Sequence, residues 1–172
     1  MTLSANARMD GAEWPCQPVP DPVKRLVARF YRLIDATAPK CSQQLADHVF
    51  TLDGEFVVNK RRMVGREQIV NWHAGGDDIV ARRHEVHKIY VCSDSGEDLL
   101  MTGTLTMQSD VGLIGETSYT ARCVVDDASS LKPRVELWQF WLDPTPFFDL
   151  GIMRPPMRKM SASGILDTIG GR

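Results

Sequence analysis

The chain has 172 residues, of which 43% are hydrophobic and 24% are charged, which is the composition of one globular domain with a well-filled core. Twenty Lys and Arg residues against 22 Asp and Glu residues give a formal net charge of −2, which excludes a global basic field for nucleic acid or an anionic membrane. Four cysteines without a Cys-x-x-Cys pair, and no signal-peptide or membrane-spanning run, predict a reduced, soluble, cytoplasmic protein.

The first half of the chain carries helical patterns. Residues 1–20 are rich in proline and are expected to form an extended arm. Asp21-Pro22 is a typical helix start, and apolar residues then recur at helical spacing, which predicts a helix over residues 21–35. A short second helix is expected over residues 42–48.

The rest of the chain is dominated by strand patterns. A strand over residues 50–59, interrupted at Asp53-Gly54, leads into a third helix over residues 65–72. Four longer strand-like runs, separated by turn sequences, span residues 81–92, 98–108, 113–127 and 134–142. This order predicts an α+β fold in which the N-terminal helices pack in the concave face of a curved, mostly antiparallel sheet. The sequence after Asp143-Pro144 is expected to be irregular, with one helical turn over residues 164–169.

Alternation along the fifth strand leaves two registers open. Tyr119 lies on one face of this strand, whereas Glu116 and Arg122 lie on the other. If Tyr119 faces a pocket, its hydroxyl can polarise a substrate oxygen, although it also fits a core tyrosine. In the reverse register Glu116 and Arg122 become the polar pair in the pocket.

Three aromatic residues fit either a core or a pocket wall. Trp138 lies in the sixth strand, and Tyr31 and Trp72 lie in the predicted helices. Such side chains shape an apolar ligand site without reacting. If Trp72 and Trp138 filled the pocket completely, the chain would be a structural dimer with a vestigial pocket.

Neither a metal nor a nucleic acid is expected as a ligand. His84 and His87 are an odd number of residues apart on a strand, so they point to opposite faces. The basic runs at residues 60–62 and at Arg82-Arg83 lack interleaved aromatic residues and a phosphate-binding glycine loop, and they are interpreted as solvated turns.

Four short motifs follow one another along the chain: Gly-Arg-Glu-x-Ile at residues 65–69, Arg83-His84, Ser118-Tyr119 and Asp143-Pro144. In their order and spacing they resemble the NTF2-like superfamily, with SnoaL-like proteins as the closest branch. The resemblance covers residues 21–150, which leaves an N-terminal arm over 1–20 and a C-terminal tail over 151–172. It implies a cone-shaped α+β fold that encloses an apolar pocket, commonly in a homodimer paired through the outer face of the sheet.

The resemblance makes His84 the first candidate for catalysis. NTF2-like dehydratases have a histidine at the start of this strand, facing the cavity, and an imidazole can take and return a proton near neutral pH. The alternative is a strand histidine that bonds to the backbone. Those dehydratases have a second histidine on the next strand, where Thr104 stands here, so a two-histidine mechanism is not expected. Asp53 or Glu116 is the expected carboxylate partner of His84, although Asp53 before Gly54 also fits a turn.

Together these residues predict a cofactor-independent isomerase, cyclase or dehydratase that acts by acid/base proton transfer. Its substrate would be a hydrophobic, oxygenated intermediate, of the kind found in polyketide or terpenoid secondary metabolism. The alternative is a non-catalytic ligand-binding or dimeric interaction module on the same fold.

Overall fold

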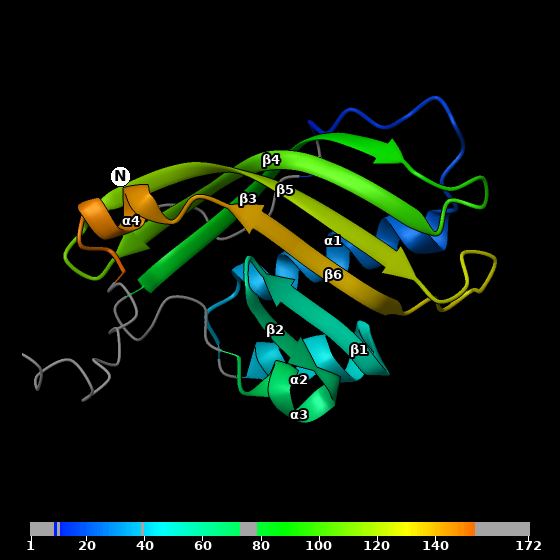
Figure 1. Ribbon diagram of the computed structural model, residues 1–172, viewed down its shortest axis with the longest axis horizontal. Helices are drawn as coiled ribbons and strands as arrows, with labels where there is room; N and C mark the ends of the chain where they lie inside the picture. The colour runs from blue at the N-terminus through cyan, green and yellow to red at the C-terminus, as the bar shows by residue number, and fades with distance from the viewer. Residues whose placement is uncertain (1–8, 10, 39, 73–78, 154–172) are drawn as a thin grey trace, which may run out of the picture.

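The computed structural model describes residues 9, 11–38, 40–72 and 79–153 (Figure 1). The elements are α1 (Asp21–Asp35), α2 (Lys40–His48), β1 (Phe50–Val58), β2 (Arg61–Val64), α3 (Gly65–Val70), β3 (Ile79–Val91), β4 (Asp98–Ser109), β5 (Ile114–Val125), β6 (Val135–Leu142) and α4 (Thr145–Asp149). The expected helix over residues 21–35 is confirmed with the same bounds, and the other expected helices and strands within the described part of the chain are confirmed to within about two residues at most ends. The helical turn expected over residues 164–169 lies outside the described residues.

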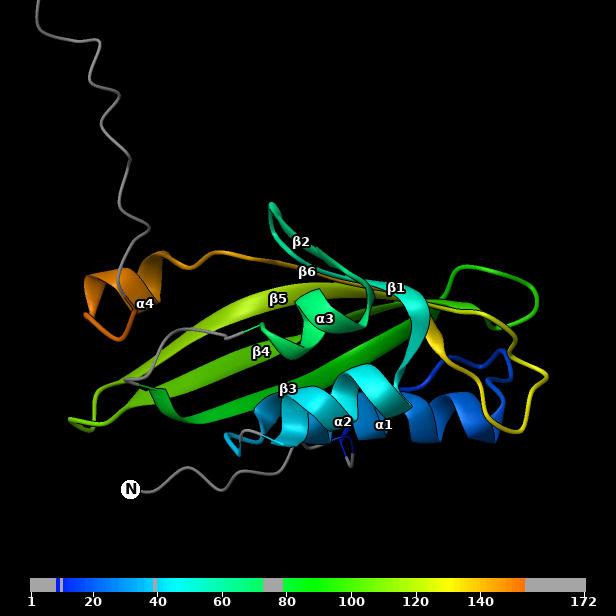
Figure 2. The same ribbon diagram turned by 90° about the horizontal axis from the view of Figure 1, so that it is seen from below.

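The six strands form one sheet in the order β2-β1-β6-β5-β4-β3. The expected meander from β3 to β6 is antiparallel throughout, whereas β1 pairs with β6 in parallel. The sheet is curved, and α1 lies along its concave face, while α2 and α3 lie beside β1 (Figures 1 and 2). The predicted α+β architecture is therefore confirmed.

Two elements were not expected. β2 pairs with β1 at the edge of the sheet, and three of its four residues are exposed. Its two arginines therefore reach solvent, and such a polar edge strand has the same composition as a turn, which is why the sequence did not predict it. α4 begins directly after Pro144, and its own proline, Pro146, stands in its first turn, where no backbone N–H is needed. The buried Phe147 of α4 packs over Gly115 of β5, so this short helix closes one end of the core.

Alternation in the strands decides which side chains enter the core. In β5, Tyr119 is buried, whereas Glu116 and Arg122 are exposed on the outer face. Arg122 there forms two hydrogen bonds with the carboxylate of Asp98, at 2.9 and 2.7 Å. The first of the two registers, with Tyr119 inward, is therefore the observed one.

The centre of the core is aromatic. Phe30 of α1 stacks on Trp138 of β6, with the rings nearly parallel, and Phe56 and Phe140 meet Phe30 from either side. These side chains are almost fully removed from solvent. The burial of these large rings stabilises the packing of α1 against the concave face of the sheet.

The segment before α1 extends along the free edge of β3. The Glu13 N–H donates to the carbonyl of His87 at 2.8 Å, and the Ile89 N–H donates to the carbonyl of Glu13 at 3.0 Å. This short pairing covers part of an otherwise open edge. None of the described helices is both long and apolar enough to cross a bilayer.

Gly103 of β4 marks the tightest approach in the sheet. A Cβ atom there would lie 2.2 Å from the carbonyl oxygen of Glu85 and 2.7 Å from the hydroxyl of Tyr119. We expect Gly103→Ala to lower the free energy of unfolding by about 2 kcal/mol, because the sheet and the Tyr119 ring must both move. Thr102→Ala, one residue away, is the control. Equal unfolding midpoints in urea for the two variants would contradict this expectation.

Candidate active site

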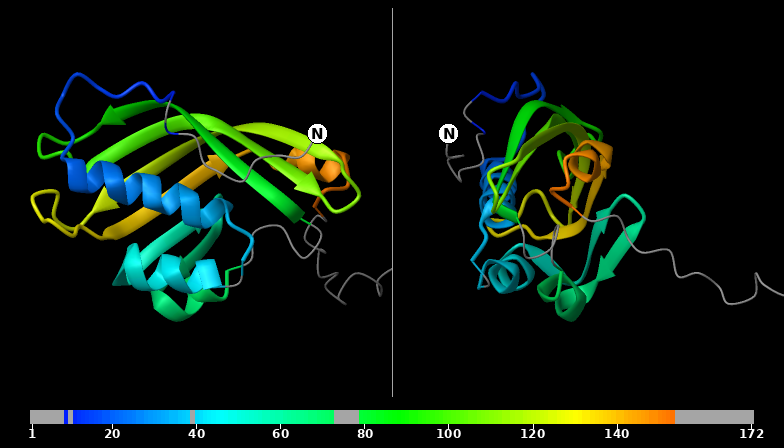
Figure 3. Two further views of the ribbon diagram at one scale, coloured as in Figure 1. Left: turned by 180° about the vertical axis from the view of Figure 1, so that it is seen from behind. Right: turned by 90° about the vertical axis from the view of Figure 1, so that its left-hand side faces the viewer.

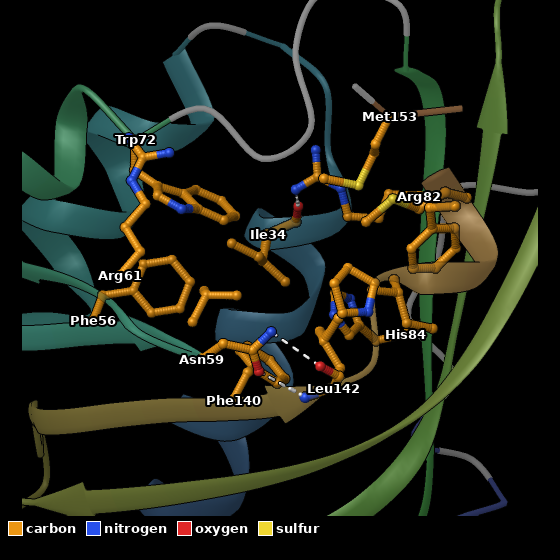
Figure 4. A pocket seen from close by; sticks show the side chains of 15 residues that line it. Ile34, Phe56, Asn59, Arg61, Trp72, Arg82, His84, Phe140, Leu142 and Met153 are labelled. Carbon is orange, nitrogen blue, oxygen red and sulfur yellow. Dashed lines mark hydrogen bonds between the residues drawn. The ribbon is translucent and has the colours of Figure 1, made fainter. Parts of the chain in front are cut away.

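A cavity of about 190 Å³ opens between the end of α1, the β1–β2 hairpin, α4 and the strands β3, β4 and β6 (Figure 4). Its walls are mostly apolar. The polar side chains in the lining are those of Asn59, Arg61, Arg82 and His84, and no carboxylate of the described residues lines it. The volume lies below the ~300 Å³ at which typical ligand pockets begin, so the cavity suits a small molecule of one or two rings.

His84 lies in the wall of this cavity and is held by Asp35. His84 Nδ1 is 2.5 Å from Asp35 Oδ1, and the His84 backbone N–H donates to Asp35 Oδ2 at 2.9 Å. Both side chains are buried, that of Asp35 completely. Because an ionised carboxylate only accepts hydrogen bonds, Nδ1 carries a proton in this contact, and Nε2 is the ring nitrogen left to exchange a proton with a ligand.

Asp35 stands where local rules disfavour a carboxylate. It is the last residue of α1, at the negative end of the helix dipole, and it is fully buried. Such a position is stable only if the charge is compensated by hydrogen bonds and a nearby cation. The site provides both, which favours a functional role over a purely structural one.

Arg82 is the nearby cation. It lies two residues before His84 in β3, on the same face, and its Nη1 donates to the carbonyl of Ile34 at 3.1 Å. Burial lowers the pKa of Arg82, and the charge of Asp35 opposes that shift. Its guanidinium also faces the Trp72 ring, with 5.6 Å between its central carbon and the ring centroid.

The interpretation of Arg82-Arg83 as a solvated turn is therefore wrong. β3 begins at Ile79, so both arginines lie within the strand. Strand alternation directs Arg82 inward, where it is 8% exposed, and Arg83 outward, where it pairs with Glu85 at 3.0 Å.

Aromatic rings hold the imidazole on its other sides. The Tyr119 ring meets His84 edge to face, with centroids 5.3 Å apart, and Phe140 stacks on it at 5.2 Å. Tyr31 lies 5.6 Å away and its hydroxyl donates to the sulfur of Met101. Burial raises the pKa of both tyrosines, so their hydroxyls stay protonated. Neither tyrosine lines the cavity, so both pack behind His84 instead of facing a ligand.

Asn59 fixes the mouth of the cavity. Its backbone has a left-handed φ of 52°, in the turn between β1 and β2. Its amide donates to the carbonyl of Leu142 at 2.9 Å and accepts from the Leu142 N–H at 3.0 Å. These two hydrogen bonds hold the β1–β2 hairpin against the end of β6, so Asn59 shapes the opening of the cavity. The sequence alone did not indicate this role of Asn59.

The expected carboxylate partners of His84 are corrected. Asp53 is exposed on β1 and Glu116 is exposed on the outer face of β5, so neither reaches the imidazole that Asp35 binds. Asp35 was missed because it lies at a helix end 49 residues before His84, and no sequence spacing links the two.

Three other expected site residues also lie away from the cavity. Thr104 faces outward, where its hydroxyl is 3.3 Å from His87 Nε2, and Leu105 is the residue opposite His84. Arg122 is on the outer face with Asp98. Trp138 is in the core against Phe30, so it does not fill the cavity. Trp72 alone of the expected aromatic residues lines it, as Figure 4 shows.

Neither a family model nor a curated protein matches this chain. Solved structures do match it. An NTF2-like protein of unknown function from Burkholderia pseudomallei has a TM-score of 0.58 at 11% identity, covering 76% of this chain and 97% of that protein. TerC, co-crystallised with polyporic acid, has a TM-score of 0.55 at 12% identity, with coverage of 76% and 98%. A phenazine biosynthesis-related protein from Pseudomonas aeruginosa has a TM-score of 0.55 at 10% identity, with coverage of 85% and 94%. At such low identity these matches establish the fold alone, which is NTF2-like, as the resemblance implied.

The role of Asp35 can be tested against that of Asp53. Asp35→Ala leaves two buried donors of His84 without their acceptor and removes a negative charge that favours the charged form of Arg82, so we expect a loss of about 3 kcal/mol in the free energy of unfolding. Asp53→Ala removes an exposed carboxylate and is expected to change it by less than about 0.5 kcal/mol. Urea denaturation followed by tryptophan fluorescence measures both. A larger loss of unfolding free energy in Asp53→Ala than in Asp35→Ala would contradict Asp35 as the partner of His84 and favour Asp53.

Proposed function

We propose that this chain of NTF2-like fold is a cofactor-independent, SnoaL-like enzyme that transfers a proton within a small, apolar, oxygenated molecule. The outcome would be isomerisation, cyclisation or dehydration. The observation that supports this most is the Asp35–His84 pair, which holds an oriented imidazole in the wall of a mostly apolar cavity. A carboxylate, an oriented histidine and an apolar pocket are the components of general base catalysis.

His84 is the proposed general base and then general acid. Nε2 takes a proton from a carbon beside a carbonyl group, and the electron pair of that C–H bond moves toward the carbonyl oxygen. Asp35 stabilises the imidazolium that forms. In isomerisation the proton returns to a different carbon; in dehydration it goes to a leaving hydroxyl group, which departs as water. Since Leu105 lies opposite His84, one histidine carries both steps.

Arg82 is proposed to stabilise the oxygen on which negative charge develops. It shares the inner face of β3 with His84, and the lining contains guanidinium groups but no carboxylate of the described residues. A fixed cation in a largely apolar cavity favours an enolate-like transition state over the neutral ground state. Trp72 and Phe140 would hold the ring system of the substrate between apolar walls.

The structural neighbours support the choice of substrate class. One was co-crystallised with polyporic acid and another is related to phenazine biosynthesis. We therefore place the substrate among cyclic intermediates of secondary metabolism, with polyketides and terpenoids as the first classes to test. The cavity volume favours a smaller molecule of one or two rings.

A non-catalytic binding module is the second candidate. The small volume and the mostly apolar lining favour it, because such a pocket can hold a ligand by burial alone. The two candidate functions differ in the role of His84. An enzyme needs Nε2 of His84 to take a proton, whereas a binding module needs only the packing contacts of the imidazole ring.

His84→Gln tests the proposed chemistry. We expect it to slow enzyme-catalysed proton exchange about 100-fold, because glutamine cannot take a proton at neutral pH. The readout is the loss of the α-proton NMR signals of cyclic ketones, with 2-tetralone as the first probe, in D₂O. His87→Gln, three residues along β3 on the outer face, is the matched control and should exchange as fast as the unmodified protein. If His84→Gln still binds the ligand and exchange is unchanged, the proposed catalysis by His84 is wrong, and the non-catalytic binding module remains as the candidate function.

We further propose a homodimer through the outer face of the sheet. Trp141 of β6 and Tyr90 of β3 expose 42% and 43% of their surface there, and Glu116 and Arg122 of β5 are exposed on the same face. Exposed aromatic residues on a sheet face are typical of subunit contacts.

Trp141→Glu should convert this dimer to a monomer, because it introduces a charge at the centre of the apolar contact. Size-exclusion chromatography with light scattering at several protein concentrations measures the mass. Leu52→Glu, an exposed apolar residue of β1, is the control and should leave the dimer intact. A monomeric mass for the unmodified protein would contradict the proposed dimer.

A further inference from the structure

A second hollow, of about 430 Å³, lies at the far end of α1 from the candidate active site. It is formed where the first turns of α1 lie beside the connection between β5 and β6 (Figures 1 and 3). The two sites have no lining residue in common. A ligand in this hollow would therefore not touch His84 or Arg82.

All the ionisable side chains of this hollow are basic. Arg25 and Arg29 come from the exposed face of α1, His48 from the end of α2, and Lys132 and Arg134 from the β5–β6 connection. No carboxylate is among its lining residues within the described part of the chain. Five basic groups from three separate segments converge on one concavity in a chain whose formal net charge is −2.

These positive charges are not neutralised by the protein. None of the ion pairs found among the described residues includes Arg25, Arg29, Lys132 or Arg134. Arg134 is instead positioned by the backbone, since its Nη1 donates to the carbonyl of Asp47 at 2.6 Å.

The acidic groups of the same segments do not line the hollow, and they bind other groups. Both carboxylate oxygens of Asp47 accept hydrogen bonds from Arg66, at 2.5 and 3.2 Å, and this contact lowers the pKa of Asp47. Asp21, at the start of α1, pairs with Lys24 at 3.6 Å. In the β5–β6 connection, Asp126 accepts from the Arg134 backbone N–H at 2.7 Å and Asp127 accepts from Ser129. No carboxylate of the described residues therefore forms an ion pair with the arginine and lysine side chains of the hollow, and a bound anion would lower their mutual repulsion.

The chemistry of the hollow fits phosphate groups. Guanidinium forks donate two parallel hydrogen bonds to phosphate oxygens, and three arginines with one lysine match an anion that carries several charges. The volume lies within the range of small-ligand sites, so the hollow suits a molecule and not an extended chain. Among the described residues, its lining contains no Phe, Tyr or Trp ring on which a nucleic-acid base would stack.

We propose that this hollow is a binding site for the di- or triphosphate group of a small molecule. The site is independent of the proton-transfer activity proposed above, because it involves none of the same residues. α1 is shared by both sites: its buried face ends in Asp35, and its exposed face presents Arg25 and Arg29.

Calorimetric titration of the full chain with inorganic triphosphate tests the proposal. We expect saturable binding, weakened at least about 10-fold in the double variant Arg25→Gln/Arg29→Gln, because two charge-assisted contacts are lost. The control is Arg32→Gln/Lys40→Gln, which changes the net charge equally at exposed positions outside the hollow and should bind within about twofold of the unmodified protein. His84→Gln should bind triphosphate normally, which separates this site from the candidate active site.

Three outcomes would overturn the proposal. They are the absence of saturable binding by the unmodified protein, equal weakening in the two double variants, and tighter binding of a short duplex DNA than of triphosphate. Equal weakening would indicate a general charge effect, and tighter DNA binding would indicate a nucleic-acid surface.

Discussion

The candidate active site depends on the buried contact between Asp35 and His84. One carboxylate accepts hydrogen bonds from both the imidazole and the backbone of the same residue, and so it fixes the ring and the strand together. It also joins the end of α1 to β3, elements that are far apart in the sequence. A fully buried carboxylate is costly, and Arg82 reduces that cost by placing a positive charge nearby. The proposed catalytic group and the attachment of the helix are thus parts of one interaction.

Strand alternation explains how one sheet separates two kinds of surface. Arg82 and His84 point into the cavity, whereas Arg83 and Glu85 pair with each other on the outer face. Gly103 of β4 leaves room for the Tyr119 ring, which then supports the imidazole edge. The Asp35 carboxylate and the Tyr119 ring therefore both position the imidazole of His84. Gly103 contributes indirectly, because it has no side chain that would displace the Tyr119 ring.

The sequence predicted the elements better than it predicted the site. Asp21-Pro22 and the apolar spacing after it determine α1, and turn residues separate the long strands, so local physics is sufficient for both. His84 came from the family resemblance. Its partner Asp35 did not, because the contact joins a helix end to a strand and has no local signature. Thr104 was expected in the site but lies on the outer face of β4, next to Leu105, which pairs with His84; a shift of one residue on a strand exchanges the two faces.

The departures from local preference gather around the cavity. Asp35 ends a helix with the wrong charge, Arg82 is a buried arginine, and Asn59 adopts a left-handed backbone to bond with Leu142 at the mouth. Each is unfavourable alone and is tolerated because its neighbours compensate for it. The aromatic core between Phe30 and Trp138 contains no charged side chain, although it is equally buried. Burial alone therefore does not account for the charged groups at the cavity, whereas the proposed chemical role would account for them.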